Sequence, residues 1–386
     1  MDCIIGGVEG GATETKLVLM KSDGSVLTWL EAPGSNYYIV GLREAVEQLA
    51  EMVQKAKVQA NLNVAQPLRA LGLALSGAEN DEMNDQMIEE FKKSFPHVAK
   101  EYYVTTDSVG SVLTSLPSGG IILIAGTGSS ARLLNPDGSI YGCGAWGHMI
   151  GDEGSAYWVA MSAIKTVFND DDGLVHCPFD TTYVKSKMMH FFGIKHKVEL
   201  LDQIYLKFQK AEFSKFCRVL AEGAAKDKDQ LCLSLFHENG IVLGRHILGV
   251  AKHADKSLLS QPGGLPVVTV GSVWKSFHLM KQGFLQGLQP RDKSDVKIER
   301  IRLLQLTASA AIGAAHLAAT KADVPLEIDF SKNASLLFET KNVTCVWISG
   351  NQRKLAHNTE SKLQQSPTNS YTVLLYLFTG LPYSSR

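Results

Sequence analysis

The stretch "GGVEGGATETKLVL", Gly6 to Leu19, decides the fold, because four glycines within six residues stand just before a run of strand-forming side chains. Glycine costs backbone entropy on folding, so this density indicates a turn that approaches a ligand or another backbone closely. A Walker A loop needs Lys followed by Ser or Thr after its last glycine, and Ala12 and Thr13 stand there instead. A dinucleotide fingerprint needs a helix after the glycines, whereas "TETKLVLM" is typical of a second strand.

Two interpretations of this stretch remain, a plain β-turn and a hairpin whose turn N–H groups and Thr13 and Thr15 hydroxyls bind a polyphosphate. The later stretch "ILIAGTGSSARLLNPDG" favours the second, because Gly126, Thr127 and Gly128 also lead into a strand and a "PDG" turn, not into a helix. Two such hairpins, one at the start of each half of the chain, predict that a polyphosphate is bound between them. In "TVGSVWKS" a buried strand ends at Gly271, where backbone can lie flat against a nucleoside.

The order of apolar runs predicts an α/β protein with two related lobes facing a cleft. The first strands and the buried strand "ALGLALSG" are expected to form a mixed sheet, with an amphipathic helix near residues 41–59 between them in sequence. A similar order of strand, glycine turn and strand begins again near Gly119. Residues 156–249 have helical spacing, and "LLQLTASAAIGAAHLAATKA" is a small-residue helix suited to close packing. We expect lobes at 1–117 and 118–337, the second with a helical insertion, and a poorly ordered polar tail at 338–386.

Composition excludes several classes of function. A formal net charge of -1, with 45% hydrophobic and 20% charged residues, gives no bias toward nucleic acid or an anionic membrane. The six cysteines contain no C-x-x-C pair, which argues against a zinc site and a disulfide framework and favours a cytoplasmic protein. We expect no leader peptide, no membrane span and no protein-bound metal site.

Asp107, in "YYVTTDSVGSVLTSL", stands where a strand should end and a helix should begin. One interpretation is an N-cap. The other is catalytic, because phosphoryl transfer from ATP to an alcohol needs a carboxylate that orients the hydroxyl and accepts its proton. The start of a helix would help to keep that carboxylate charged.

The densest group of polar and aromatic residues is "GCGAWGHMIGDEGSAYW". Trp146 offers a flat apolar face to a sugar ring, and Asp152 and Glu153 offer acceptors for neighbouring hydroxyls. His148 has no metal-ligand spacing around it, so we interpret it as a partly buried structural histidine. Asn36, in "APGSNYYIVG", has an amide that can both donate to and accept from a sugar.

Taken in order, these segments resemble the N-acetylglucosamine kinase family within the sugar kinase, Hsp70 and actin ATPase superfamily. The resemblance spans about residues 1 to 335 and is carried by "GGVEGGAT", "LGLALSG", "YYVTTDSVGS", "ILIAGTGSSARLLNPDGS", "GCGAWGHMIGDEGSAYW", "FCRVLAEGA" and "VGSVWKS". It implies two ribonuclease-H-like lobes of the actin-like ATPase fold and transfer of the γ-phosphoryl of ATP, with Mg²⁺, to O6 of N-acetylglucosamine. It further implies a homodimer and a cytosolic role in amino-sugar salvage.

The resemblance also implies roles for individual residues. Asp107 would be the general base. ATP would contact Thr13, Thr127, Ser214, Gly271 and Ser276. The sugar would contact Asn36, Asp107, Ser129, Ser130, Ala145, Trp146, Gly147 and Asp152.

Three residues and the tail depart from the family pattern. Ala12 and Ala145 stand where glycine is usual, and Ser130 stands where Asn is expected. If the first turn requires a positive φ at Ala12, glycine there should recover stability or ATP affinity. These departures keep open a weakened homologue that binds a sugar or a partner as a sensor. A kinase for N-acetylmannosamine or a muropeptide also stays open, whereas a nicotinamide dehydrogenase would require tighter binding of NAD than of MgATP.

Overall fold

The first sheet begins with the hairpin that the glycine-rich stretch predicts. The computed structural model describes residues 3–291, 295–340 and 343, all within one compact unit. Strands β1 (Ile4–Gly10) and β2 (Glu14–Lys21) pair antiparallel, with Gly10 opposite Thr15 at the turn. The sheet has the order β3-β2-β1-β4-β5, in which β1, β4 and β5 run parallel. Its other strands are β3 (Val26–Pro33), β4 (Ala70–Leu75) and β5 (Tyr102–Thr106).

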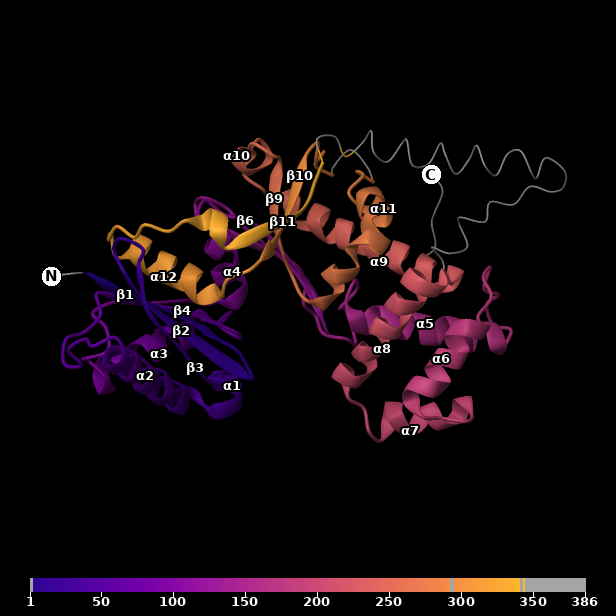
Figure 1. Cartoon of the computed structure of the whole chain (residues 1–386), viewed down its shortest axis with the longest axis horizontal. Helices are drawn as coiled ribbons and strands as arrows, with labels where there is room; N and C mark the ends of the chain where they lie inside the picture. The colour runs from indigo at the N-terminus through magenta and orange to yellow at the C-terminus, as the bar shows by residue number, and fades with distance from the viewer. Residues whose placement is uncertain (1–2, 292–294, 341–342, 344–386) are drawn as a thin grey trace. The chain divides into compact units, whose positions relative to one another are not determined.

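Helices from opposite ends of the chain cover the two faces of this sheet. One face packs on α2 (Leu42–Gln59) and α3 (Asp81–Ser94), and the short helix α1 (Tyr37–Val40) precedes α2 in the chain. The bounds of α2 are close to those of the predicted helix at 41–59. The other face packs on α12 (Ala310–Lys321), whose alanines contact Ile5 and Val18. Figure 1 shows α12, in orange, beside the indigo strand β1. The alanine-rich face lets this helix lie close to the sheet, because alanine adds little beyond its Cβ.

The second sheet repeats the first. Its order is β11-β10-β9-β6-β7-β8, so β8-β7-β6-β9-β10 corresponds to β3-β2-β1-β4-β5 with the same parallel and antiparallel pairings. The strand β11 adds an antiparallel edge. This repetition confirms the expected pair of ribonuclease-H-like lobes of the actin-like ATPase fold. The strands are β6 (Gly120–Ala125), β7 (Ser129–Leu134), β8 (Ile140–Gly144), β9 (Leu265–Val270), β10 (Ile301–Leu306) and β11 (Ala334–Thr340).

Between β8 and β9 the chain is helical, as the spacing over 156–249 predicts. Ser155 caps the first helix, because its hydroxyl accepts from the N–H of Trp158 at 3.1 Å. Within the described residues, no helix is both long and apolar enough to cross a membrane. Besides α12, the helical elements that follow β8 in the described residues are α5 (Ala156–Asp171), α6 (Thr182–Phe192), η1 (Lys197–Glu199), α7 (Leu200–Tyr205), α8 (Lys210–Glu222), η2 (Gly223–Asp227), α9 (Gln230–Ala251), α10 (Lys256–Leu259), η3 (Ser272–Ser276), α11 (Phe277–Gly287) and η4 (Phe330–Lys332).

Helix α4 (Asp107–Ser115) is fixed by a close crossing with α12. A Cβ built on Gly313 would lie 1.9 Å from the carbonyl oxygen of Gly110, so only glycine allows the helices to approach this closely. The hydroxyl of Thr114 accepts from the N–H of Gly313 at 3.1 Å. The apolar side of α4 also packs against β6 and β9. The residue at the start of α4 therefore sits on a rigid support.

The predicted tail begins inside a strand. Strand β11 continues to Thr340, three residues beyond the expected boundary at 337/338, and pairs there with Ile301. Most of the expected tail, residues 344–386, lies outside the described residues. The lobe boundary at 117/118 and the extent of the tail stay predictions.

Candidate functional site

The carboxyl edge of the first sheet gathers one group of the predicted site residues. Because β1, β4 and β5 are parallel, they end at the same edge, where Gly11, Ser76 and Asp107 follow them directly. In α/β sheets ligands bind at this edge, where loops leave the strands. The N–H of Ser76 donates to the carbonyl of Gly10 at 2.8 Å, which ties the two loops together.

Asp107 is the first residue of α4, not its N-cap. Thr106 is the N-cap, and its hydroxyl accepts from the N–H of Val109 at 3.3 Å, so the Asp107 carboxylate is not used for capping. That carboxylate accepts from the N–H of Ser108 and from the side chain of Ser76. Burial raises its pKa, the charges of Glu79 and Glu9 add to the rise, and the two hydrogen bonds oppose it. The sequence predicted that the charged form would be favoured, whereas burial gives the larger effect and the pKa of Asp107 is raised.

Asn36 and Asp107 are joined through one residue whose role the sequence did not reveal. The side-chain Nδ2 of Asn36 donates to the carbonyl of Ser76 at 3.0 Å, while the side chain of Ser76 hydrogen-bonds to Asp107. The Oδ1 of Asn36 accepts from the N–H of Tyr38, which caps α1. Within the described residues, the second N–H of the Asn36 amide has no recorded partner, so it can donate to a ligand.

A cavity of about 480 Å³ opens beside this edge. It is lined by the β1–β2 turn with Thr13, by Asp107, and by the segment 306–309 that leads from β10 into α12. The predicted phosphate turn and the predicted base therefore share one cavity. The sequence interpretation placed segment 306–309 inside a small-residue helix over 303–322. That prediction was wrong at its start, because residues 303–306 belong to β10 and the helix begins at Ala310.

The two threonines of the first turn behave differently. Thr13 is exposed, as a phosphate contact would require. Thr15 is buried, and its hydroxyl donates to the carbonyl of Pro33 at 3.0 Å and lies 2.9 Å from the hydroxyl of Ser35. The interpretation of Thr15 as a phosphate contact was wrong, because its side chain fastens the turn to the end of β3.

Glu9 is a further carboxylate at this cavity that the sequence interpretation missed. It accepts from the hydroxyl of Ser309 at 2.5 Å and from the N–H of Ala310 at 3.0 Å. Both donors belong to the start of α12, where the helix dipole favours negative charge. Glu9 thus anchors the helix that covers the sheet, and it places negative charge near Asp107.

The second sheet gathers the other group of predicted residues. A Cβ on Gly271 would lie 2.3 Å from the carbonyl oxygen of Ala125 and 2.8 Å from the nitrogen of Gly126, and its φ is 110°. Only glycine fits there, so the end of β9 lies against the glycine hairpin that carries the exposed Thr127. Ser276 ends η3 and is half-buried.

The loop after β8 contains several left-handed residues. Ala145 has a φ of 68° and Gly147 one of 73°, and the N–H of Ala145 donates to the carbonyl of Ser129 at 3.2 Å. Trp146 is 73% exposed, so its indole face is open to a ligand. Ala12 is absent from the described non-glycine residues with positive φ. The strain considered for Ala12 therefore occurs at Ala145 instead.

Asp152 is buried and already has two donors. Its Oδ1 accepts from the N–H of Ser129 at 3.1 Å, and its Oδ2 lies 2.6 Å from the Nζ of Lys210 on α8. The hydroxyl of Ser129 donates to the carbonyl of Glu153 at 2.7 Å, while the half-buried Ser130 pairs with Gly144 in the β7–β8 ladder.

Two other predicted residues have structural partners. His148 is half-buried, stacks on Phe208 at 5.0 Å between ring centres and meets the edge of Tyr157. This agrees with the structural interpretation of that histidine. Ser214 is buried within α8, and its hydroxyl donates to the carbonyl of Lys210 at 2.8 Å. Its oxygen can still accept from a ligand.

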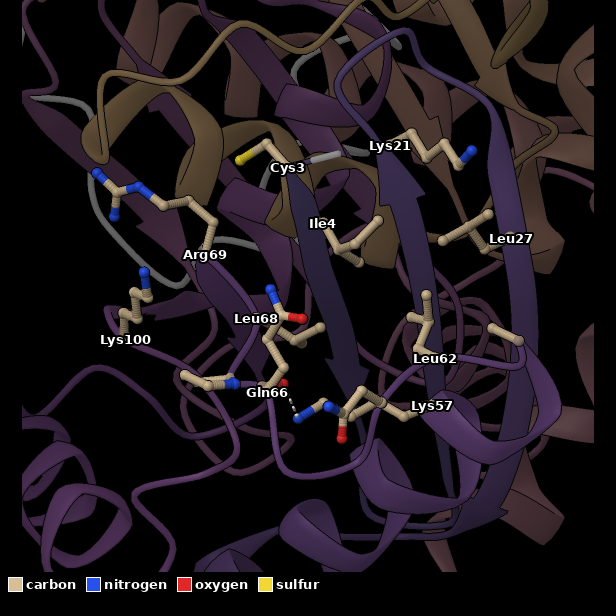
Figure 2. Close-up of a pocket in the computed structure, with 13 residues that line it drawn as sticks. Cys3, Ile4, Lys21, Leu27, Lys57, Leu62, Gln66, Leu68, Arg69 and Lys100 are labelled. Carbon is tan, nitrogen blue, oxygen red and sulfur yellow. Dashed lines mark hydrogen bonds between the residues drawn. The ribbon is translucent and has the colours of Figure 1, made fainter. Parts of the chain in front are cut away.

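A separate cavity of about 510 Å³ lies where β1 and β4 begin, at the opposite edge of the first sheet (Figure 2). Lys57 is fully buried there, and its Nζ donates to the carbonyls of Gln66 at 3.0 Å and His97 at 2.7 Å. Arg69 pairs with Glu101 at 2.5 Å. These cations hold loops together, and none of the predicted site residues lines this cavity.

No group of three or more His, Cys, Asp or Glu side chains that could hold a metal occurs among residues 3–291, 295–340 and 343. The five cysteines in that part of the chain are free thiols. The chemistry available at the two edges is therefore a half-buried carboxylate with raised proton affinity, glycine turns with exposed hydroxyls, the exposed indole of Trp146 and the buried carboxylate of Asp152.

Comparison with known proteins gives a family model and two named relatives. The model of the BadF/BadG/BcrA/BcrD ATPase family matches residues 7–318. The chain is similar to the N-acetylmuramic acid/N-acetylglucosamine kinase of Clostridium acetobutylicum, with 23% identity over 318 residues that cover 82% of this chain and 98% of the relative. It is also similar to the N-acetyl-D-glucosamine kinase of Dictyostelium discoideum, with 27% identity over 175 residues, or 43% of this chain and 54% of that one.

Solved structures agree on the fold. A provisionally named N-acetylglucosamine kinase from Chromobacterium violaceum matches with a TM-score of 0.57 and 24% identity, covering 81% of this chain and 98% of that one. A similarly named protein from Porphyromonas gingivalis matches with a TM-score of 0.53 and 18% identity, covering 81% and 99%. At this level of identity the likeness concerns the fold.

Proposed function

The chain belongs to the BadF/BadG/BcrA/BcrD ATPase family, and from this we propose that it is an ATP-dependent kinase that phosphorylates N-acetyl-D-glucosamine at O6. The observation that carries the proposal is the cavity in which the glycine turn with Thr13 meets Asp107. A phosphate turn next to a half-buried carboxylate is the minimum that phosphoryl transfer to an alcohol requires. The names of the two relatives support an amino sugar as the acceptor.

In the proposed reaction the sugar O6 attacks the γ-phosphorus and the bond from phosphorus to the β–γ bridging oxygen breaks, releasing ADP. Asp107 takes the proton of the O6 hydroxyl. Its raised pKa makes it a better proton acceptor than an exposed carboxylate. Ser76 hydrogen-bonds to both Asp107 and Asn36, which supports the proposal that the base and a sugar contact act side by side.

Mg²⁺ fits this site as part of MgATP. Mg²⁺ is commonly held by one or two carboxylates together with substrate phosphates and water, and the exposed Glu14 lines the cavity beside the turn. When bound, it would neutralise charge on the phosphates. The chain itself contributes the turn N–H groups and the exposed Thr13 and Thr127 hydroxyls.

The test is a coupled ADP-release assay with N-acetylglucosamine. Asp107→Asn should lower kcat by about 10²-fold to 10⁴-fold, the range typical of a lost general base. Asp81→Asn is the matched control, because Asp81 is also the first residue of a helix but is exposed, and it should leave kcat unchanged. Wild-type turnover that survives in Asp107→Asn would remove Asp107 from the mechanism. Sugar binding without any wild-type turnover would favour the sensor.

The acceptor is decided by a panel of sugars. N-acetylglucosamine should be phosphorylated and its 6-deoxy analogue should not, if O6 is the acceptor. N-acetylmuramic acid belongs in the panel because the Clostridium acetobutylicum relative carries it in its name, and N-acetylmannosamine and a muropeptide complete it. Higher kcat/KM for one of these would replace the proposed substrate. The expected homodimer, tested by analytical ultracentrifugation, and the cytosolic salvage role are part of the same proposal.

A further inference from the structure

The carboxylate of Asp152 is held in an unusual position. Asp152 has a left-handed backbone, with a φ of 65°, and is only 4% exposed. Aspartate tolerates this conformation better than most residues, but a buried carboxylate is costly unless donors surround it. Its Oδ1 accepts from the N–H of Ser129 at 3.1 Å, which supplies one donor from the strand beside the glycine hairpin.

The second donor comes from a distant helix. Lys210, at the start of α8, places its Nζ 2.6 Å from the Oδ2 of Asp152, and the two side chains are 27% and 5% exposed. Such a pair differs from ordinary surface ion pairs, because removing the cation leaves an uncompensated charge in a buried place. Lys210 also lies against the hairpin. A Cβ on Gly128 would be 2.7 Å from Asp152 Oδ1 and 3.2 Å from Lys210 Nζ.

The remaining acceptor capacity of Asp152 fits a diol. A carboxylate has about four lone-pair positions, and two protein donors from the described part of the chain use Oδ1 and Oδ2 once each. One position on each oxygen is left for a hydroxyl of the ligand. The lysine and the Ser129 N–H thus fix the plane of the carboxylate that two neighbouring sugar hydroxyls would meet.

We propose that Lys210 is a positioning residue of the sugar site, which holds the Asp152 carboxylate in the orientation that receives two hydroxyls of the acceptor. The inference rests on the proposed sugar kinase function. It assigns to α8 a role at the acceptor, on the same helical turn as Ser214, whose hydroxyl donates to the carbonyl of Lys210. Lys210 touches Asp152 and the hairpin, and acts on the sugar through the carboxylate.

The experiment compares Lys210→Met with a matched pair on the same helix. Lys215 forms an ion pair with Glu212 at 2.5 Å, but the two side chains are 63% and 52% exposed, so Lys215→Met should leave all constants unchanged. Lys210→Met should raise the KM for N-acetylglucosamine about tenfold or more, because the buried carboxylate loses its cation, while the KM for ATP changes less than about twofold. Lys210→Arg keeps the charge and should recover part of the affinity for the sugar.

A double variant separates positioning from a direct effect. In Asp152→Asn the group that Lys210 orients has lost its charge, so adding Lys210→Met should raise the sugar KM less than about twofold further. Full additivity would overturn the proposal. A rise in the ATP KM in place of the sugar KM would also overturn it, because Lys210 would then act on the nucleotide.

The outcomes distinguish this inference from the proposed function. Wild-type turnover with an unchanged sugar KM in Lys210→Met overturns the inference and leaves the kinase intact. If no acceptor in the panel is turned over, the kinase proposal fails, and calorimetric titration with N-acetylglucosamine decides the inference alone. Binding that weakens in Lys210→Met and not in Lys215→Met supports the inference. Binding that is the same in Lys210→Met as in the wild type overturns it, and so does the absence of detectable binding by the wild type. Should Lys210→Met not fold, Lys210→Gln provides the same comparison, with Lys210→Arg as the variant that keeps the charge.

Discussion

Replacing Ala145 with glycine is expected to stabilise the protein. The residue has a φ of 68°, which costs an L-amino acid about 1–2 kcal/mol. Glycine removes that strain but increases the entropy of the unfolded chain, which costs about 0.4–1 kcal/mol. The two ranges leave a gain of up to about 1.6 kcal/mol, centred near about 0.8 kcal/mol, in the free energy of unfolding, seen as a rise of about 1–2 °C in the thermal midpoint of a chain this long.

The control for this change is Ala12→Gly. Ala12 is also an alanine in a loop at a glycine-rich stretch, but it is absent from the described residues with positive φ. The same substitution there should lower the free energy of unfolding by about 0.5–1 kcal/mol, because only the entropy term remains. Both variants are measured by urea and thermal unfolding followed by circular dichroism. If Ala145→Gly lowers stability as much as Ala12→Gly, the strain argument is refuted.

Two predictions concern pH. Burial raises the pKa of Asp107, so the folded protein keeps that proton to higher pH than the unfolded chain and loses stability as pH rises through the interval between the two pKa values. Asp107→Asn should therefore have a higher free energy of unfolding than the wild type at pH 7, although it is inactive. In urea titrations this difference in the free energy of unfolding should shrink toward pH 4, and a difference independent of pH would contradict the prediction. Burial lowers the pKa of Lys57 to about 8, from 10.5, so between these values the unfolded chain holds the extra proton and stability rises with pH. The stability of the wild type relative to Lys57→Met should increase from pH 7.5 to pH 10 in urea titrations, and a constant difference would show that Lys57 does not titrate in this window.

Much of the fold could be predicted from local pattern. The hairpins at Gly11 and Gly126, the helix over 42–59 and the strand at 70–75 were all visible as glycine turns and apolar spacing. The position of α12 was not. Its small residues predicted close packing, but nothing local indicates that it covers the first sheet and not the second, since that depends on chain topology.

The site was predictable where a residue follows a strand end directly, as Asp107 does. It was not predictable where the partner is remote in sequence. Lys210 looks like any surface lysine in "KFQKAEF", and only the fold brings it to Asp152, 58 residues away. The prediction for Thr15 was wrong for a related reason. A hydroxyl next to a glycine turn resembles a phosphate contact in the sequence, and only the fold shows that this one bonds to Pro33 and Ser35.

The dependence of the first sheet on α12 has a consequence for synthesis of the chain. Glu9 and Ala310, which join β1 to that helix, are 301 positions apart. At about 5–20 residues per second, a ribosome needs about 15–60 s to supply the second after the first. Throughout that interval the face formed by Ile5 and Val18 lacks its cover. A nascent chain of this protein should therefore engage chaperones that bind apolar strands, and release from them should follow emergence of α12.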